Sequence, residues 1–457
     1  MGKSNTNHSL QPDARSGAFE ILQRVEEGGY ADLLLDRYLE RHSQMERRER
    51  GLLTELVYGV LRLRGRVDFA LTLVSRQPLQ KLEPAARLLL RLGAYQLLEL
   101  DRVPTHAAVN STVELARALG KERLVGIING TLRGLERSRA NIDWPTPETP
   151  RPYLQHVCSL PQWLAKALLS QHTNREAIAL GEALAEAAPF TLRVNTLKTD
   201  RDSLLAAMSE AGHSVRPCRY APEGIILERR SEQPLPGADQ GWYQVQDQAS
   251  MLISHLLAVN PGQRILDCCA APGGKTTHLA ALSDNQCSIL ALDKHPHRVE
   301  LIRQGAARLG CTQIDAKQWD LTSAPDFAEA ESFDRVLLDA PCSGIGVLRR
   351  NPESRWNRTA ADVKDLAALQ AQLLHQAALL VAPGGSLLYS VCTFTKAETD
   401  GVIEHFLQAH PQFKLESLQD GLAESWQELL TEQGTLRTMP QLHDGMDAFY
   451  AARLVKA

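Results

Sequence analysis

Two cysteines occupy positions where a thiol could take part in chemistry. Cys342 lies in the turn Pro341-Cys342-Ser343-Gly344 after one predicted strand, and Cys392 follows another predicted strand in Ser390-Val391-Cys392-Thr393. A partly exposed thiol at a strand end, near helix N-termini, can shift toward the reactive thiolate, whereas a thiol buried in an apolar core is inert. The two turns should face the same crevice, so the spacing predicts a pair of thiols available for nucleophilic chemistry.

The other cysteines suggest neither a zinc site nor a second nucleophile. Zinc sites need spacings such as C-x2-C, and the only cysteines close in sequence, Cys268 and Cys269, are adjacent and form a poor chelate. The hydrolase motifs G-x-S-x-G and H-E-x-x-H are absent. We therefore expect no metal, and we assign no chemical role to Cys158, Cys218, Cys287 and Cys311.

A loop of small residues follows the first strand of the predicted sheet. It reads Cys269-Ala270-Ala271-Pro272-Gly273-Gly274-Lys275, and its glycines allow the backbone to approach a ligand and present N–H groups at a helix start. The loop fits neither G-x-x-x-x-G-K-[ST] nor G-x-G-x-x-G, which disfavours a nucleoside triphosphate.

Acidic residues end or follow the next three strands. Asp293 lies near the offset of ~20 residues at which a doubly wound fold places an acid on ribose hydroxyls. Asp320 could receive the exocyclic amine of an adenine, and Asp339 precedes the Cys342 turn. A single aspartate is often only a turn or helix-capping residue, but three at successive strand ends favour a nucleoside ligand.

Alternating strands and helices must position these residues. Since ligands bind beyond the carboxyl ends of the strands in an open α/β sheet, this pattern predicts a doubly wound, mostly parallel sheet with one ligand crevice. The expected strands are Arg264–Cys268, Ser288–Asp293, Gln313–Lys317, Arg335–Asp339 and Ser386–Ser390.

The rest of the chain predicts two further modules. Asp13–Arg139 has the apolar periodicity of an all-α domain, and four prolines mark Asn141–Pro152 as a linker that neither helix nor central strand can accommodate. Residues 153–240 alternate helical runs (Leu160–Gln171, Asn174–Glu186) with short strands (Thr191–Asn195, Gly224–Leu227), which predicts a small α+β module. We place the domains at residues 1–143, 144–240 and 241–457.

Composition agrees with a multidomain globular protein. The 457 residues are 44% hydrophobic and 23% charged, and 50 basic residues face 54 acidic ones, which excludes a globally basic nucleic-acid binder. Basic residues exceed acidic ones only in the N-terminal helical region, where six arginines could neutralise phosphates or simply form a solvated helix face. They are Arg47, Arg48, Arg50, Arg62, Arg64 and Arg66.

The sequence predicts a cytoplasmic protein. No apolar run approaches ~18 residues, and the polar start MGKSNTNHSLQPDAR lacks the apolar core of a secretory signal. Eight irregularly spaced cysteines in a long chain fit a reducing compartment. We expect neither a membrane span nor structural disulfides.

The loop Cys269–Lys275, the turn Asp339–Gly344 and the segment Ser390–Thr393 together resemble the signature motifs of the RNA cytosine-C5 methyltransferases. The full chain resembles the bacterial 16S ribosomal RNA members of that family, and its N-terminal region resembles the antitermination factor NusB. The resemblance implies a NusB-like helical domain that binds RNA, a small α+β module and a Rossmann-like methyltransferase domain.

The resemblance also implies a cofactor and its binding residues. S-adenosylmethionine would be the methyl donor, with the loop Cys269–Lys275 around its methionine and ribose, Asp293 on the ribose hydroxyls and Asp320 near the adenine. Asp339 would lie beside both the donor and the target base.

Catalytic roles follow from the same resemblance. It implies that Cys392 adds to C6 of cytosine, that Cys342 assists the later elimination, and that Asp339 hydrogen-bonds the ring at N3 and the amine. The residue types alone leave open which thiol is the nucleophile. Val391 departs from the small polar residue that many relatives carry before the nucleophile, which affects only the fine geometry.

The expected partner is 16S ribosomal RNA, unassembled or in a partly assembled small subunit, bound by a monomer. The target base must leave its stack or lie in a loop. Arg349, Arg350, Arg355 and Arg358 with Trp356 form a candidate RNA contact, or else a solvated loop. Two alternatives stay open, which are a transfer-RNA cytosine-C5 methyltransferase and a non-catalytic NusB-like RNA-binding factor.

Overall fold

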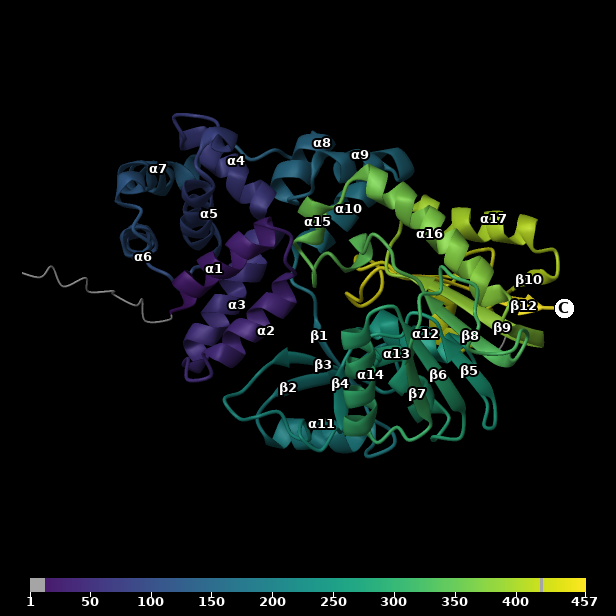
Figure 1. Ribbon diagram of the computed structural model, residues 1–457. Coiled ribbons are helices and arrows are strands. Elements are labelled where there is room, and N and C mark those ends of the chain that lie inside the picture. Colours follow the sequence, from purple (N-terminus) through teal and green to yellow (C-terminus); the bar gives the residue numbers. More distant parts are fainter. Residues whose placement is uncertain (1–12, 420–421) are drawn as a thin grey trace, which may run out of the picture. The chain divides into compact units, whose positions relative to one another are not determined.

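The computed structural model describes residues 13–419 and 422–457 and divides into two units (Figure 1). The helical unit contains the described residues up to Ala187 and also Leu348–Asn357, while the sheet unit contains Ala188–Val347 and Arg358–Ala457. Most of the polar N-terminal segment considered above lies outside the described residues. Within the described ranges, no helix is both long enough and apolar enough to cross a membrane.

Seven helices form the first part of the helical unit, as the apolar periodicity predicted. Asp13 starts the first helix with a reciprocal capping box, in which its carboxylate accepts from the Ser16 N–H at 2.7 Å. Buried Leu, Ile and Val side chains from all seven helices make one continuous core. The helices are α1 Ala14–Glu26, α2 Ala31–Arg41, α3 Arg47–Arg62, α4 Arg64–Val74, α5 Pro84–Glu99, α6 Thr105–Ala118 and α7 Val125–Ser138.

The proline-rich segment is less irregular than expected. Pro150–Pro152 forms the short helix α8 and continues into a π-helical turn over Tyr153–Val157, so the expectation that no helix fits here is wrong. The reason is that proline is tolerated in the first turn of a helix, where its missing N–H has no intrahelical partner anyway. Helices α9 (Gln162–Gln171) and α10 (Asn174–Ala185) follow.

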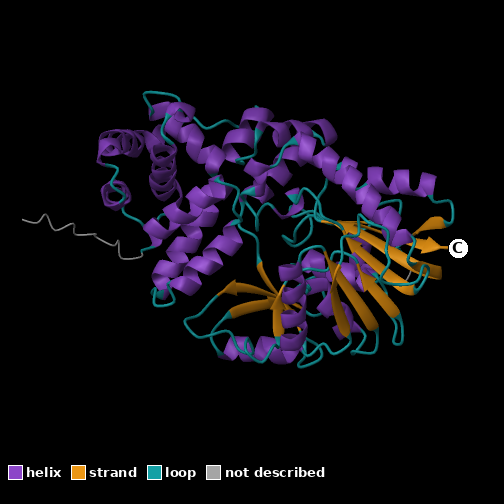
Figure 2. Ribbon diagram, in the orientation of Figure 1, coloured by secondary structure: helices purple, strands orange, loops and turns teal. Residues whose placement is uncertain are grey.

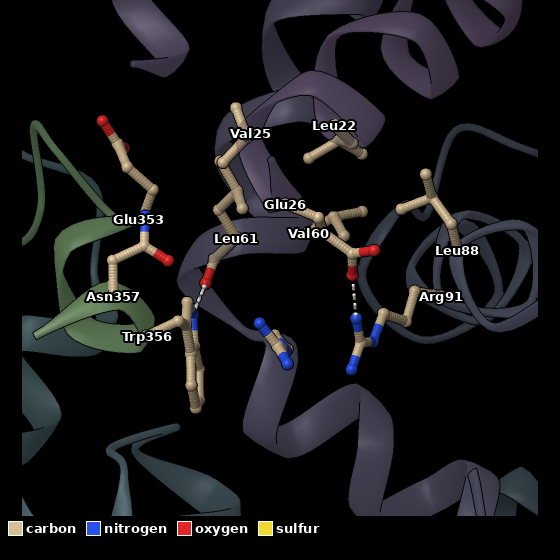
Figure 3. Close-up of a pocket in the computed structure, with 11 residues that line it drawn as sticks. Leu22, Val25, Glu26, Val60, Leu61, Leu88, Arg91, Glu353, Trp356 and Asn357 are labelled. Atoms are coloured by element: carbon tan, nitrogen blue, oxygen red, sulfur yellow. Dashed lines mark hydrogen bonds and ion pairs between the residues drawn. The ribbon is translucent and has the colours of Figure 1, made fainter. Parts of the chain in front are cut away.

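A short segment from far along the chain belongs to the helical unit. Arg355, in helix α15 (Ser354–Asn357), is fully buried and donates to the carbonyl oxygens of Arg62, Ser159 and Leu184. The indole of Trp356 donates to the Leu61 carbonyl at 2.6 Å, and its ring lines a pocket that contains the Glu26–Arg91 ion pair (Figure 3). Arg355 is therefore structural, and its proposed contact with RNA is wrong because its guanidinium has no access to solvent.

Three of the six candidate phosphate-binding arginines face carboxylates inside the helical unit. Arg66 pairs with Glu99 at 3.0 Å, whereas Arg62 and Arg64 lie 3.8 Å from Glu55 and Asp68. Arg48 and Arg50 are exposed on α3. The exposed pair is thus better placed for phosphate than the three paired arginines.

The sheet unit begins with a four-stranded antiparallel sheet. Its strand order is β2-β3-β1-β4, and helix α11 (Arg201–Glu210) packs on it around Leu204 and Met208. The two expected strands are present as β1 and β3, whereas β2 and β4 were not anticipated, and the two helices expected in the same module, α9 and α10, belong to the helical unit. The strands are β1 Phe190–Val194, β2 Ser214–Pro217, β3 Gly224–Arg229 and β4 Tyr243–Val245.

An eight-stranded mixed sheet follows, with helices on its faces (Figure 2). The path runs β10-β12-β9-β8-β5-β6-β7, with β11 paired to β12, and the four contacts among β9, β8, β5, β6 and β7 are parallel. The strands are β5 Arg264–Asp267, β6 Ser288–Asp293, β7 Ile314–Gln318, β8 Phe333–Asp339, β9 Val381–Val391, β10 Phe413–Glu416, β11 Leu436–Arg437 and β12 Tyr450–Lys456. The helices are α12 Gln248–Leu256, α13 Gly274–Leu282, α14 Pro296–Leu309, α16 Ala360–Ala378 and α17 Asp400–Ala409.

This sheet confirms the predicted fold class. All five expected strands are present and parallel, and the order places β5 and β8 side by side at the point where the connections reverse direction. The antiparallel edge made by β12 and β10 was not predicted. The domain boundaries at 143 and 240 stay predictions, since the two units are defined by contacts rather than by those positions.

Candidate active site

The loop after β5 supplies the first group of candidate site residues. Gly273 adopts a left-handed conformation with φ 99°, and a Cβ there would lie 3.3 Å from Ile302 Cα, so the turn requires glycine. Helix α13 begins at Gly274 without a side-chain cap, which leaves its first N–H groups available to an anionic ligand. Ala270 is buried, Cys269 and Ala271 are partly buried, and Pro272 is exposed.

The next two strand ends carry aspartates in different environments. Asp293 is 7% exposed at the end of β6, and its carboxylate accepts from the His295 N–H at 2.9 Å. Asp320 follows β7 and pairs with Lys294 at 2.8 Å. Hydrogen bonds from Lys294 and Thr322 lower the pKa of Asp320 to about 2, so this carboxylate is ionised at neutral pH.

Asp339, at the end of β8, is held by one side chain from the start of α13 and one from the end of β9. One carboxylate oxygen accepts from Lys275 Nζ at 2.6 Å and the other accepts from Ser390 Oγ at 2.7 Å. Burial alone would lower the pKa of Lys275, but the Asp339 carboxylate outweighs it and raises that pKa. The Lys275–Asp339 ion pair therefore connects the loop after β5 to the end of β8, and Ser390 connects the same carboxylate to β9.

The two predicted thiols are in direct contact. Cys342 Sγ and Cys392 Sγ lie 3.2 Å apart, and both residues are partly exposed. A backbone hydrogen bond joins their turns, since the Gly346 N–H donates to the Cys392 carbonyl at 3.0 Å. Position 346 requires glycine, because a Cβ there would lie 2.1 Å from the Ala448 carbonyl oxygen. The structure thus brings together Cys342, Cys392, Asp339 and Lys275, as the strand-end argument expected.

Burial and neighbouring groups raise the pKa of two cysteines in this region. The hydrogen bond to Cys392 and burial raise the pKa of Cys342 well above its ordinary value, which keeps Cys342 protonated. Lys275, whose ammonium is paired with Asp339, also lies close enough to Cys392 to interact with it electrostatically. Burial raises the pKa of Cys269, so this third cysteine of the region stays a thiol.

Sequence reasoning missed a set of hydrogen bonds that connect the small antiparallel-sheet module to the start of α13. Arg193, on β1 and fully buried, donates to the Gly274 carbonyl, to Gln246 and to Thr277 Oγ1. Asn195, two residues on, donates to the Leu309 carbonyl at the end of α14. The module therefore fixes the two helices that follow β5 and β6; no local sequence signal links Arg193 to a loop so distant in the chain.

A second missed cluster joins the same two parts of the sheet unit. The carboxylate of Glu223 lies 3.0 Å from His255 Nε2 and 2.9 Å from His278 Nε2, and within residues 13–419 and 422–457 this is the one group with metal-ligand spacing. Burial and the nearby Arg193 guanidinium lower the pKa of His278 to about 4. A buried positive charge disfavours a further cation, so we interpret the cluster as structural, with a hydrogen bond between Glu223 and His255, and with His278 in close contact.

A doubly wound sheet with a glycine loop after its first strand and acids after the next strands is the architecture of an S-adenosylmethionine-dependent methyltransferase. The residues fit that group, because the uncapped start of α13 suits a carboxylate and Asp293 suits a ribose. Comparison with known proteins identifies the family. The description "16S rRNA methyltransferase RsmB/F" matches residues 254–455, "NusB family" matches 12–137, and "Methyltr_RsmF/B-like, ferredoxin-like domain" matches 160–232.

Full-length relatives give the same result. The chain is 36% identical over 444 residues to the probable ribosomal RNA small subunit methyltransferase B of Bacillus subtilis, covering 97% of this chain and 98% of that protein. It is 34% identical over 420 residues to ribosomal RNA small subunit methyltransferase B of Pseudomonas putida, covering 90% and 92%. The chain belongs to the 16S rRNA methyltransferase RsmB/F family, and its methyl donor is S-adenosylmethionine.

A solved structure shares the whole fold. The crystal structure of PH0851 superposes with a TM-score of 0.82 at 26% identity and covers 98% of this chain and 99% of that one. The NusB-like helices, the small module and the methyltransferase domain predicted by resemblance are thus confirmed as the architecture.

Proposed function

We propose that this methyltransferase transfers the methyl group to C5 of a cytosine in 16S ribosomal RNA through a covalent bond between Cys392 and C6. The observation that carries the proposal is the contact of the two sulfur atoms, 3.2 Å apart beside the Asp339–Lys275 pair. C5 of cytosine is a weak nucleophile, and a thiolate added at C6 makes it enamine-like. A second thiol next to the first can then serve the step that releases the product.

The reaction would proceed in three steps. The Cys392 thiolate forms a bond to C6, and the electron pair of the 5,6 double bond becomes available at C5. Bound S-adenosylmethionine supplies an electrophilic methyl carbon, to which C5 bonds as the methyl–sulfur bond breaks. Cys342, after losing its own proton to solvent, then accepts the C5 proton as a thiolate, and the electron pair of the broken C5–H bond reforms the double bond as the bond from C6 to Cys392 breaks.

The two thiols suit these different tasks. Cys392 is the thiol assigned to the attack on C6, whereas the hydrogen bond to Cys392 and burial raise the pKa of Cys342, which stays protonated during that attack. Asp339 would hydrogen-bond the cytosine at N3 and the amine, and Ser390 and Lys275 fix its carboxylate for that contact. Asp293 would bind the ribose of the cofactor, and Asp320 would lie near its adenine.

The 16S target rests on the relatives and on the N-terminal helices. Relatives at 33–36% identity are named small subunit methyltransferases, and the NusB family match spans the helical unit's first seven helices. We propose that a monomer acts in the cytoplasm on naked or partly assembled small-subunit RNA, with exposed basic residues such as Arg48 on α3 in contact with phosphates.

The test is transfer of a radiolabelled methyl group from S-adenosylmethionine to transcribed 16S ribosomal RNA, followed by digestion to nucleosides. We expect the label in 5-methylcytidine, with transfer RNA as a poor substrate. Label in another nucleoside would contradict C5 chemistry, and label confined to transfer RNA would favour the alternative substrate. Tight retention of RNA on a filter with no transferred label would favour a non-catalytic binding factor.

A further inference from the structure

A buried carboxylate lies behind both thiols. Glu398, in the short 3-10 helix Lys396–Glu398, has a side chain with no solvent exposure and contacts the turns of Cys342 and Cys392. We propose that Glu398 is a positioning residue, which fixes the relative positions of the two sulfur atoms through Ser343 and Thr393. This inference rests on the proposed function.

The first part of the argument is the pattern of hydrogen bonds. Ser343, next to Cys342, donates its N–H to Oε1 of Glu398 at 2.7 Å and its hydroxyl to Oε2 at 2.6 Å. Thr393, next to Cys392, donates its hydroxyl to Oε2 at 3.2 Å. The two hydroxyls also lie 3.1 Å apart, so a single carboxylate joins the residues that follow the two thiols.

Further contacts fix Glu398 itself. Thr395 Oγ1 donates to Oε2 at 2.9 Å, and Gln370 Nε2, from α16, donates to Oε1 at 3.1 Å. The same Gln370 amide donates to the Pro341 carbonyl at 3.0 Å, immediately before Cys342. Tyr389, on β9, donates its hydroxyl to the Glu398 carbonyl at 2.7 Å. Thr395 and Gln370 therefore fix the carboxylate of Glu398, and Tyr389 fixes its backbone.

The chemistry of the donors explains why an acid is needed. Oε1 accepts from two N–H groups and Oε2 accepts from three hydroxyls, and an ionised carboxylate accepts on both oxygens. A glutamine would present an NH2 group to one of these sets, so some donors would lose their acceptor in a buried site. Glutamine keeps the shape of the side chain, which makes Glu398→Gln a conservative probe of the charge and acceptor pattern.

The carboxylate of Glu398 also affects the pKa of Cys342. After the hydrogen bond to Cys392 and burial, the Glu398 carboxylate is a further cause of the raised pKa of Cys342. The negative charge thus supports the protonated state of Cys342 while the hydrogen bonds set its place.

The test separates the two turns with three variants assayed on transcribed 16S ribosomal RNA. Thr393→Val removes the bond on the Cys392 side and should slow formation of the covalent RNA adduct. Ser343→Ala removes the hydroxyl bond on the Cys342 side and should slow release, so that adduct accumulates. Glu398→Gln should slow both steps and lower kcat about tenfold or more, because small misplacements of reacting groups are costly.

Several readouts distinguish positioning from loss of structure. The Kd for S-adenosylmethionine and the KM for RNA should stay within about twofold of wild type in all three variants, and the double variant Glu398→Gln/Ser343→Ala should lose less than the product of the single losses. Ser283→Ala is the matched control, since this buried serine, directly after α13, donates its hydroxyl only to backbone carbonyls. It should retain wild-type kinetics.

Two outcomes would overturn the proposal. Wild-type adduct formation and release in Glu398→Gln, Ser343→Ala and Thr393→Val would show that the carboxylate does not position the thiols. Activity lost only in proportion to the folded fraction would assign Glu398 a purely structural role. If the wild-type enzyme itself methylates RNA without any adduct, the proposed function fails as well, so the two failures are distinguishable.

Discussion

The Sγ atoms of Cys342 and Cys392 lie 3.2 Å apart, although the two residues are fifty positions apart in the chain. Parallel strands β8 and β9 produce this contact, since they are neighbours in the sheet and their carboxyl ends open on the same side. Cys392 directly follows β9, Cys342 lies shortly after β8, and Asp339 at the end of β8 accepts a hydrogen bond from Ser390 on β9. The contact between the two thiols thus follows directly from the sheet topology.

Replacing Asp339 by asparagine should reduce methyl transfer by about 100-fold, because its carboxylate is the acceptor for Lys275 and Ser390 and the proposed partner of the base. The fold should persist, since asparagine has the same shape. The measurement is single-turnover transfer of label to 16S ribosomal RNA. Ser390→Ala, which removes only one support of the carboxylate, should cost about tenfold; equal losses in both variants would contradict a direct role of Asp339.

The two other strand-end acids should differ in their effect on cofactor affinity. Asp293 is buried at the end of β6 and should be needed for the ribose hydroxyls, so Asp293→Ala should raise the Kd for S-adenosylmethionine about tenfold or more. Asp320 is already paired with Lys294, and Asp320→Ala should have a smaller effect. Titration calorimetry measures both values. A larger loss at Asp320 than at Asp293 would reverse the assignment.

Asp267 predicts a pH dependence of stability. Burial raises the pKa of this carboxyl, at the end of β5, from 3.8 to about 7, so the folded state prefers the protonated form. Between about pH 4 and 7 the unfolded chain binds fewer protons than the folded one, and the stability of the wild type therefore falls as the pH rises through this window.

Asp267→Asn removes that dependence. The Tm of this variant relative to that of the wild type should increase from pH 5 to pH 8. The corresponding change in relative unfolding free energy is on the order of a few kcal/mol. Thermal melts across this range provide the measurement, with the exposed Asp365→Asn as control. A Tm difference that stays constant with pH would show that Asp267 is ionised throughout.

Arg355→Ala should unfold the helical unit more easily without a specific effect on RNA. The buried guanidinium donates hydrogen bonds to three carbonyl oxygens. Leaving a buried acceptor without its donor lowers the unfolding free energy by about 1–3 kcal/mol. The salt dependence of RNA binding, measured on the folded fraction, should match the wild type. A reduced salt slope would place Arg355 on phosphate after all. Arg358→Ala, at a partly exposed position nearby, is the comparison.

The sequence predicted the parts of the site that obey local rules. Asp293, Asp339, Cys342 and Cys392 could be identified because each lies at or just after a strand, and strand ends converge in this fold class. The thiol pair was expected in one crevice for the same reason.

Residues whose partners are distant in the chain could not be found this way. Arg193 donates to the Gly274 carbonyl from another module, and Arg355 donates to the carbonyl of Arg62, 293 residues earlier in the chain. Glu398 lies only six residues after Cys392, but nothing in its local pattern distinguishes a buried acceptor from an exposed acid. Long-range polar contacts of this kind depend on the completed fold, not on periodicity or spacing.

The division of labour between the thiols is the central claim, and a denaturing gel tests it most directly. Cys392→Ala and Cys342→Ala are each incubated with labelled 16S ribosomal RNA and S-adenosylmethionine, then denatured so that only covalent complexes stay joined. Cys392→Ala should show neither turnover nor a protein–RNA band, whereas Cys342→Ala should accumulate that band because release is blocked. A band that persists in Cys392→Ala and is absent from Cys342→Ala would contradict the account.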